Sequence, residues 1–314
     1  MRILFMGAGD IAVPAFQSLI GGEHELVALV TQPDRPVGRK QELKPSLVKQ
    51  AALEAGIPVE QPESLKTVEA LAMLEGYEAD LFVVMAYGQI LSQAVISTPS
   101  QACINLHASL LPKYRGASCI QAAIEAGDQE TGITVMHVVK KLDAGDVILR
   151  EAIEIQAGET AGELHDRLAE LAPVALGKAL EALTAGCATR EVQIDSESSY
   201  APKLGRHDGV IDWSRPAEEI ERLIRAYFPW PGTSTKFESK GREKVLKILP
   251  PVEVVTDLEI LSDGPREAGT WSKLVPGVIY CGEGALKLGP VQPEGSRAMD
   301  VVDFLNGNPQ VLGA

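Results

Sequence analysis

The chain has 314 residues, 45% of them hydrophobic, and carries a net charge of −14 at pH 7. This length suits two domains better than one, and the hydrophobic content is ordinary for a folded protein with a sizeable core. The acidic balance taken alone argues against a nucleic-acid partner, because phosphate binding relies on lysine and arginine, although an average can hide a local basic patch.

Cysteine and histidine usage excludes two further classes. The four cysteines form no CxxC pair and the five histidines show no zinc-ligand spacing, so neither a disulfide framework nor a metal site is expected. The opening sequence lacks the long apolar core of a signal peptide, and no apolar run approaches the roughly 20 residues that span a bilayer. We therefore expect a reduced, cytoplasmic chain with no membrane contact.

The first half of the chain alternates short apolar runs with helical patterns. Strands are predicted at Ile3–Met6, Leu26–Thr31, Leu81–Ala86, Ala102–Leu106 and Ile133–Val138. A helix is predicted at Pro14–Ile20, and Ser46 can cap another that runs to about Ala55. Apolar runs without alternation are typical of strands buried on both faces of a parallel sheet. This order predicts a parallel α/β sheet that binds ligands at the carboxyl ends of its strands.

The second half of the chain has a different pattern of predicted elements. A long helical pattern over Ala161–Leu183 ends at Gly186, and the polar residues 187–206 have the composition of a linker. A helix at Pro216–Tyr227 is followed by short strands broken by glycine and proline, at Thr233–Glu238, Lys244–Ile248, Gly277–Tyr280 and Ala285–Leu288. We therefore predict a first domain over residues 1–186, a linker over 187–206 and a small β-barrel domain over 207–314.

The turn after the first strand, Gly7–Ala12, matches the Gly-x-Gly-x-x-Ala fingerprint of dinucleotide-binding proteins. Asp34 ends the second strand at about the usual spacing, so an NAD-dependent oxidoreductase is one alternative. However, Arg35 and Pro36 follow at once and begin a long basic loop rather than a ribose pocket. We favour a tight strand-to-helix turn that binds no nucleotide.

The stretch Cys103–Asp146 holds the residues most suited to catalysis. Asn105 and His107 lie two residues apart, and so on one face at the end of a strand, while Asp143 lies in a turn after the next strand. Each residue alone would be an ordinary polar residue at a strand end or a turn. Together, with Ser109–Pro112 between them, an amide, an imidazole and a carboxylate can stabilise an oxyanion and manage a proton. This predicts acyl-group chemistry.

Basic residues gather in two segments of this acidic chain. Arg35–Lys49 holds five positive charges against one acid, and Lys236–Lys247 holds five against two. Two local patches on such a chain indicate a polyanion that is held at chosen points and repelled elsewhere. The second segment could equally be an ordinary exposed hairpin.

The segment Asn105–Asp146 resembles the folate-dependent formyltransferases, which carry a pattern like I-N-x-H-x-S-L-L-P…D-x-G-D. Thr31–Ser46, Tyr200–Leu204, Ile211–Trp213 and Arg225–Gly232 resemble the insertion loop, linker and C-terminal domain of the members that act on charged initiator tRNA. The resemblance implies a Rossmann-like, mostly parallel catalytic domain followed by a small OB-like β-barrel. It also implies formyl transfer from 10-formyltetrahydrofolate to the methionine amine of initiator methionyl-tRNA, for translation initiation, by a monomer that needs no metal.

The resemblance further implies a role for individual residues. Asn105 and His107 would donate hydrogen bonds to the formyl oxygen as it becomes an oxyanion, and Asp143 would orient His107 and help receive the amine proton. The folate would contact Ala86, Tyr87, Gly88, Ile90, Ser109, Leu110, Leu111, Pro112 and Gly145. The tRNA would contact Arg35, Arg39, Lys40, Lys44, Lys240 and Arg242, with Arg39 as the best single contact.

Two stretches depart from the family pattern. Gly7–Asp10 reads Gly-Ala-Gly-Asp where the family commonly has Gly-Thr-Pro-Asp, and residues 117–119 read Ala-Ser-Cys where Ala-Ala-Pro is frequent. We interpret Cys119 as a small core residue that opens a helix rather than as a nucleophile. Alternatives that keep the chemistry are a formyltransferase for a sugar nucleotide or for glycinamide ribotide, and a formyltetrahydrofolate hydrolase or dehydrogenase domain. A non-enzymatic RNA-binding role would leave the three polar residues unexplained.

Overall fold

The computed structural model describes residues 1–37, 42–239, 241–256 and 267–313. The chain divides into two compact units. The first unit comprises Met1–Cys119, Glu130–Glu154 and His165–Ala201, and the second comprises Ile120–Gln129, Ile155–Leu164 and Pro202–Ala314. The second unit therefore includes two short segments from the first half of the chain, so the boundaries predicted from sequence stay a prediction.

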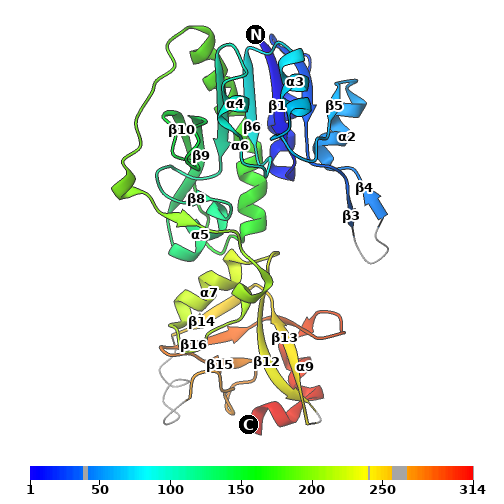
Figure 1. The fold of residues 1–314 in the computed structure, drawn as a ribbon. Helices are drawn as coiled ribbons and strands as arrows, with labels where there is room; N and C mark the ends of the chain where they lie inside the picture. The colour runs from blue at the N-terminus through cyan, green and yellow to red at the C-terminus, as the bar shows by residue number, and fades with distance from the viewer. Residues whose placement is uncertain (38–41, 240, 257–266, 314) are drawn as a thin grey trace. The chain divides into compact units, whose positions relative to one another are not determined.

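A seven-stranded sheet forms the centre of the first unit, in the order β10-β9-β7-β6-β1-β2-β5 (Figure 1). Its parallel strands are β1 (Arg2–Gly7), β2 (Glu25–Val30), β5 (Val59–Glu60), β6 (Leu81–Met85) and β7 (Ala102–His107). Two antiparallel strands, β9 (Glu130–His137) and β10 (Val147–Glu154), extend the β7 side. The predicted, mostly parallel α/β sheet is confirmed, but Ile133–Val138 was expected to be parallel, and that expectation is wrong.

Burial on both faces explains why the central strands have no polar alternation. Every residue of Leu81–Met85 is buried, as are the residues of β1 from Ile3 onward. The helices that follow the strands are η1 (Asp10–Ala12), α1 (Val13–Leu19), α2 (Leu47–Glu54), α3 (Val68–Gly76), α4 (Gln93–Ile96), α5 (Cys119–Ala126) and α6 (Ala161–Thr184). Ser46 caps α2 as predicted, because its side chain accepts a hydrogen bond from the Lys49 backbone N–H.

Shorter pairings attach two further segments to this unit. β3 (Arg35–Val37) and β4 (Glu42–Lys44) form an antiparallel pair that projects from the sheet (Figure 1). The segment after α6 runs through η2 (Asp195–Glu197) to β11 (Tyr200–Ala201), which pairs in parallel with β8 (Arg115–Gly116). Residues up to Ala201, which were predicted to be a linker, thus belong to the first unit.

The second unit is built mainly from antiparallel strands. One sheet contains β12 (Thr233–Ser239), β13 (Arg242–Ile248), β17 (Pro290–Pro293) and β18 (Met299–Asp300), and another contains β14 (Val252–Val255), β16 (Ala285–Leu288) and β15 (Val278–Tyr280). Its helices are η3 (Arg206–Gly209), α7 (Ala217–Ala226), α9 (Val301–Gly307) and η4 (Pro309–Gly313). Phe237 and Phe304 meet edge to face in its core, with ring centroids 5.1 Å apart.

Candidate active site

Asn105 and His107 lie at the carboxyl end of β7, on the same face of the strand. Asn105 pairs in register with Val84 of β6, and His107 pairs with Thr134 of β9. The carboxamide of Asn105 is partly exposed and makes no hydrogen bond with another residue in the described part of the chain. It is therefore available to a ligand.

The His107 ring is 7% exposed and is held by a hydrogen bond through one of its nitrogens. Its Nε2 lies 2.8 Å from the carbonyl oxygen of Tyr114, to which it donates, and its Nδ1 lies 3.8 Å from Oδ2 of Asp143. Burial lowers the pKa of His107, but the hydrogen-bonded sulfur of Cys119, the Asp143 carboxylate and the Tyr114 carbonyl together raise it from 6.5 to about 9. These three groups therefore favour the protonated ring.

Asp143 reaches His107 from the segment that joins β9 to β10, residues 138–146. Because β9 is antiparallel to β7, the end of β9 lies beside Ile104 and not beside His107. The sequence led us to expect Asp143 at the same sheet edge as Asn105 and His107 because all three follow strand ends, and this reason is wrong for Asp143. The turn after β9 instead places Asp143 beside His107. There its Oδ2 accepts a hydrogen bond of 2.8 Å from the backbone N–H of Gly116.

Backbone strain gathers around these residues. Positive φ angles outside glycine occur in the described residues at Glu78, Ala86, Tyr114 and Asp143. Three of these four lie near the site: Tyr114 supplies the acceptor for His107, Asp143 faces the ring, and Ala86 follows β6, the strand beside β7. Because such conformations are sparsely populated and persist where the surroundings enforce them, their clustering supports a functional site at this edge of the sheet.

The residues predicted to contact folate differ in exposure. Ala86 and Gly88 are exposed after β6, and Ile90 is 74% exposed, whereas Tyr87 is buried. Ser109 and Leu111 are buried, while Leu110 and Pro112 are partly exposed. Gly145 is buried where a Cβ atom would meet the carbonyl oxygen of His137. Thr134 pins the Ser109–Pro112 loop, because its hydroxyl donates to the Ser109 carbonyl and accepts from the Leu111 N–H.

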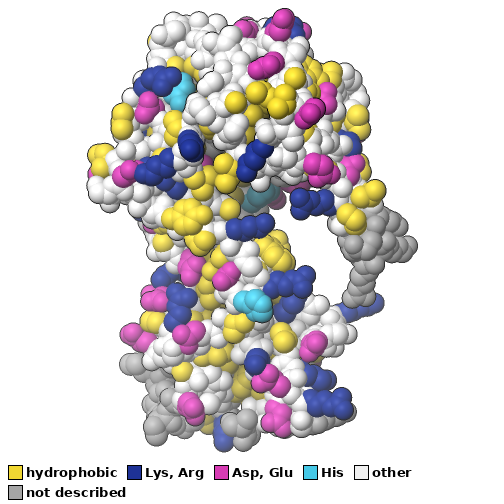
Figure 2. Space-filling view, in the orientation of Figure 1, with side chains coloured by type: hydrophobic (Ala, Val, Ile, Leu, Met, Phe, Trp, Pro, Cys, Tyr) yellow, Lys and Arg dark blue, Asp and Glu magenta, His cyan; other side chains and the backbone are white. Residues whose placement is uncertain are grey.

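Some of the residues predicted to contact tRNA are exposed and others lie outside the described residues. Arg35 and Lys44 are exposed and face each other across β3 and β4. Arg242 is exposed at the start of β13, where Lys236 pairs with Glu243 at 2.8 Å. Figure 2 shows lysine and arginine side chains interleaved with acidic ones over the second unit. Three predicted contacts fall outside the described residues: Arg39, Lys40 and Lys240.

The nucleotide alternative meets physical obstacles at Gly7–Ala12. A Cβ atom on Gly9 would lie 3.1 Å from that of Ala86, so protein already packs against this turn. A 3₁₀ turn and a short helix follow, in place of the long helix whose N-terminus binds a pyrophosphate. The Asp34 carboxylate accepts from Lys49 Nζ at 2.6 Å and from Gln61 at 3.0 Å, contacts that also lower its pKa. The Asp34 carboxylate is thus already hydrogen-bonded within the protein and is not left to bind a ribose.

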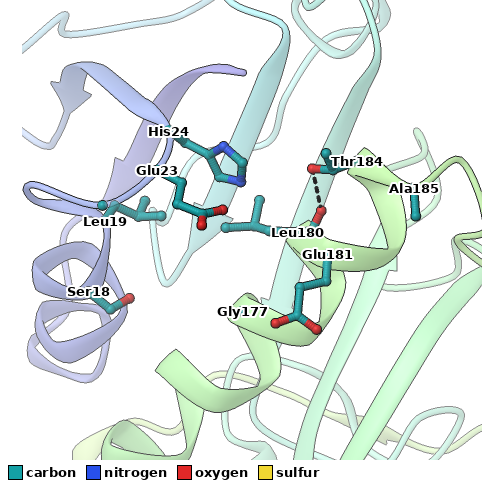
Figure 3. Close-up of a pocket in the computed structure, with 10 residues that line it drawn as sticks. Ser18, Leu19, Glu23, His24, Gly177, Leu180, Glu181, Thr184 and Ala185 are labelled. Atoms are coloured by element: carbon teal, nitrogen blue, oxygen red, sulfur yellow. Dashed lines mark hydrogen bonds between the residues drawn. The ribbon is translucent and has the colours of Figure 1, made fainter.

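A hollow of about 460 Å³ lies elsewhere in the first unit, between the turn after α1 and the C-terminal half of α6 (Figure 3). Glu23 and His24 come from the turn, and Leu180, Glu181 and Thr184 come from the helix. The Thr184 hydroxyl donates to the Leu180 carbonyl and is used within the helix. This hollow contains none of the residues that the sequence motifs single out, so we place the candidate site at the β7 edge.

Two family models match the chain. Residues 1–180 match the model described as formyl transferase, and residues 203–309 match that of the formyl transferase C-terminal domain. A protein from Akkermansia muciniphila named methionyl-tRNA formyltransferase is 51% identical over 99% of this chain and 98% of its own length. The chain belongs to the methionyl-tRNA formyltransferase family.

Solved structures of more distant proteins share the fold of this methionyl-tRNA formyltransferase family member. WlaRD, a sugar 3N-formyl transferase studied with dTDP and 5-N-formyl-THF, aligns with a TM-score of 0.66 and 18% identity over 95% of this chain and 99% of its own. HypX from Aquifex aeolicus, in complex with tetrahydrofolic acid, aligns with a TM-score of 0.63 and 18% identity over 97% of this chain, which spans 47% of HypX. These likenesses agree with the predicted fold class.

Several groups around the site of this formyltransferase family member escaped prediction from the sequence. The Tyr114 carbonyl and the Gly116 N–H are backbone groups, which residue types do not reveal. Gln193 was assigned to a polar linker, but it is buried against the Asp143 turn. The only sequence signal was that residue 116 is a glycine, which its φ of +112° and the Ala201 carbonyl that a Cβ atom would meet both require; this does not reveal that its N–H binds Asp143.

Proposed function

We propose that this chain transfers the formyl group of 10-formyltetrahydrofolate to the methionine amine of charged initiator tRNA, and that Asn105, His107 and Asp143 carry the reaction. The main support is the pairing of two hydrogen-bond donors at one strand end. Asn105 offers an amide without a partner among the described residues, and His107 offers a ring whose pKa is raised to about 9. Such donors suit an oxygen that gains negative charge.

In this reaction the amine attacks the formyl carbon, a C–N bond forms, and the carbonyl electrons move onto the oxygen. Asn105 and the Nδ1–H of His107 donate to that oxyanion, and they lower the barrier because they need no reorganisation as charge appears. Asp143 helps receive the amine proton. The bond to folate N10 then breaks and N10 gains a proton, which gives tetrahydrofolate and formylmethionine on the tRNA.

The His107 geometry leaves one ring nitrogen for this role. Nε2 is engaged by the Tyr114 carbonyl at 2.8 Å, so it holds the ring in place. Nδ1 is 3.8 Å from Oδ2 of Asp143, which is too long for a hydrogen bond, so Asp143 does not occupy that N–H. Asp143 still favours the charged ring by its own charge.

The surroundings offer what a folate requires. Ala86, Gly88 and Ile90 follow β6 at the edge next to Asn105, and they expose backbone groups and an apolar side chain there. Leu110 and Pro112 would add partly exposed apolar surface. Tyr87, Ser109, Leu111 and Gly145 would shape this wall from behind, because they are buried.

For the tRNA we propose contacts from both basic segments. Arg35 and Lys44 present two exposed charges from paired strands, and Arg242 presents one from the second unit. The contacts proposed for Arg39, Lys40 and Lys240 rest on the family resemblance. The acidic remainder of the chain would repel the tRNA elsewhere and so favour its binding at these two segments.

The test is formyl transfer from 10-formyltetrahydrofolate to three acceptors in parallel: initiator methionyl-tRNA, a 4-amino sugar nucleotide and water. We expect transfer to the tRNA and background rates with the other two. Transfer to the sugar nucleotide or to water would keep the catalytic residues and contradict the tRNA assignment. No transfer to any acceptor would contradict the proposed reaction.

A further inference from the structure

The segment 191–201, here called the strap, is fastened to the first unit at both ends. Near its start, Glu191 and Val147 exchange backbone hydrogen bonds of 2.8 and 3.0 Å. At its end, Tyr200–Ala201 pairs with Arg115–Gly116. Figure 1 shows this part of the chain passing along the β10 side of the sheet to β8. The strap is therefore an ordered part of the first unit.

Gln193 is the residue of the strap that turns inward. It is 8% exposed, whereas its neighbours Val192 and Ile194 are 72% and 56% exposed. Its side-chain Nε2 donates to the carbonyl oxygen of Asp143 at 2.9 Å and to that of Gly145 at 2.8 Å. One amide thus binds two backbone carbonyls of the turn that carries the Asp143 carboxylate.

Arg115 fixes which way this amide points. The guanidinium is 6% exposed, and its Nε and Nη2 both donate to Oε1 of Gln193, at 3.1 and 2.9 Å. Because Oε1 is held by a cation, the NH₂ group of Gln193 must face the turn carbonyls. Nη1 of Arg115 donates to Asp195 of the same strap at 2.8 Å.

The turn needs such support because Asp143 has a φ of +50°. A non-glycine residue in this conformation is held by its surroundings and relaxes when they are removed. The Asp143 side chain is restrained separately by the Gly116 N–H at 2.8 Å. The two restraints together set the carboxylate 3.8 Å from Nδ1 of His107.

We propose that Gln193 is a positioning residue for the formyl-transfer site, which holds the Asp143 turn so that its carboxylate faces His107, and that Arg115 orients the Gln193 amide for this purpose. This inference rests on the proposed roles of Asp143 and His107. Gln193 acts through the turn and does not touch the reacting atoms.

The test is Gln193→Glu, which keeps the side-chain length and the partner of Arg115 but replaces the donating NH₂ by an oxygen facing two carbonyls. We expect kcat for formyl transfer to fall about 10²-fold, as a displaced catalytic group does, with little change in KM for either substrate. The groups that face the His107 ring are Asp143, Cys119 and the Tyr114 carbonyl. Since Asp143 would move away, the His107 pKa measured by NMR should fall.

Val192→Glu is the matched control, because it places the same carboxylate one residue away on an exposed position. We expect its kcat, His107 titration and thermal unfolding to match the parent. Gln193→Met, which removes the donor without adding charge, should reproduce the losses of Gln193→Glu. Folded Gln193 variants with the parent's kcat and His107 titration would overturn the proposal.

The two readouts separate this inference from the proposed function. His107 titration needs no substrate, so it reports the position of Asp143 even if the acceptor assay fails. A changed titration with no formyl transfer in the parent protein would support the positioning role and contradict the reaction. If the parent protein transfers the formyl group but the Gln193 variants titrate like the parent, the reaction would be supported and the positioning role contradicted.

Discussion

The pKa of His107 is raised by the groups around the ring and not by exposure to solvent. Burial alone would lower its pKa, but Cys119, Asp143 and the Tyr114 carbonyl outweigh that effect. A ring that is already protonated can donate a hydrogen bond at once to a developing oxyanion. The neighbourhood of His107 thus favours the protonated ring that the proposed donor role requires.

The rate of formyl transfer should therefore have an alkaline limb. With a His107 pKa of about 9, we expect kcat to fall as the pH rises through that value, because the ring loses the proton that it donates. The raised pKa also means that the contacts of His107 stabilise the fold fully below pH 6.5, and that this contribution is lost as the pH rises through about 9. A pH–rate profile and unfolding at matched pH check both; a flat profile up to about pH 10 would contradict the donor role.

Cys119 is the departure from the family pattern with the clearest consequence. It is buried at the start of α5, as expected from the sequence, and its sulfur also hydrogen-bonds the His107 ring. We expect Cys119→Ala to reduce transfer less than about tenfold at neutral pH, since one hydrogen bond contributes about 1 kcal/mol, and to move the alkaline limb to lower pH. Removing a covalent nucleophile costs about 10⁶-fold, so a loss of that size would show that Cys119 reacts.

Elements that are set by local sequence patterns could be predicted, whereas features that depend on which distant segments pair in the fold could not. β6 and the capped helix α2 were predicted within a residue or so, because unbroken apolar runs and a capping serine act locally. The direction of β9 was not, because an apolar run looks the same in a parallel and an antiparallel strand. Gln193 shows the same limit: Val192 and Ile194 look like the buried residues of a strand, yet the amide between them faces inward.

The β3–β4 pair makes the tRNA proposal testable. We expect Arg35→Ala combined with Lys44→Ala to raise the apparent Kd for initiator tRNA and to lower the slope of log K against log salt by about one to two, since each phosphate contact contributes about 0.9. The matched control is Lys66→Ala, a charge change at an exposed position outside both basic segments. A slope equal to the parent's would rule out phosphate contacts from this pair.

For the whole chain, composition and motif spacing predicted an α/β unit followed by a small β unit, and the structure contains both. The triad Asn105, His107 and Asp143 was proposed because its residue types carry the chemistry, and its catalytic role stays a prediction. The groups around these three residues could not be predicted, since a backbone carbonyl such as that of Tyr114 exists at every residue and only the fold selects it. The domain boundaries also depend on contacts that cross the sequence order.

The core of the second unit can be tested apart from the catalytic residues. Phe304 is fully buried against Phe237, so Phe304→Ala should lower the free energy of unfolding by about 3–5 kcal/mol. Because the triad belongs to the first unit, we expect folate binding to survive when tRNA binding is weakened. Calorimetry with binding assays for each substrate measures both, and unchanged tRNA affinity in an unfolded second unit would contradict a tRNA role for it.

None of the helices in the described residues combines the length and apolar character needed to cross a membrane. The first unit presents three positive-φ residues, Ala86, Tyr114 and Asp143, beside the donor pair Asn105 and His107.

The central claim is that Asn105 stabilises the oxyanion at the carboxyl end of β7. The most direct measurement is the single-turnover rate of formyl transfer by Asn105→Ala, with the affinities for folate and tRNA determined on the same preparation. We predict a rate about 10²–10³-fold lower with both affinities nearly unchanged; a parent-like rate, or a loss explained by weaker binding, would contradict the account.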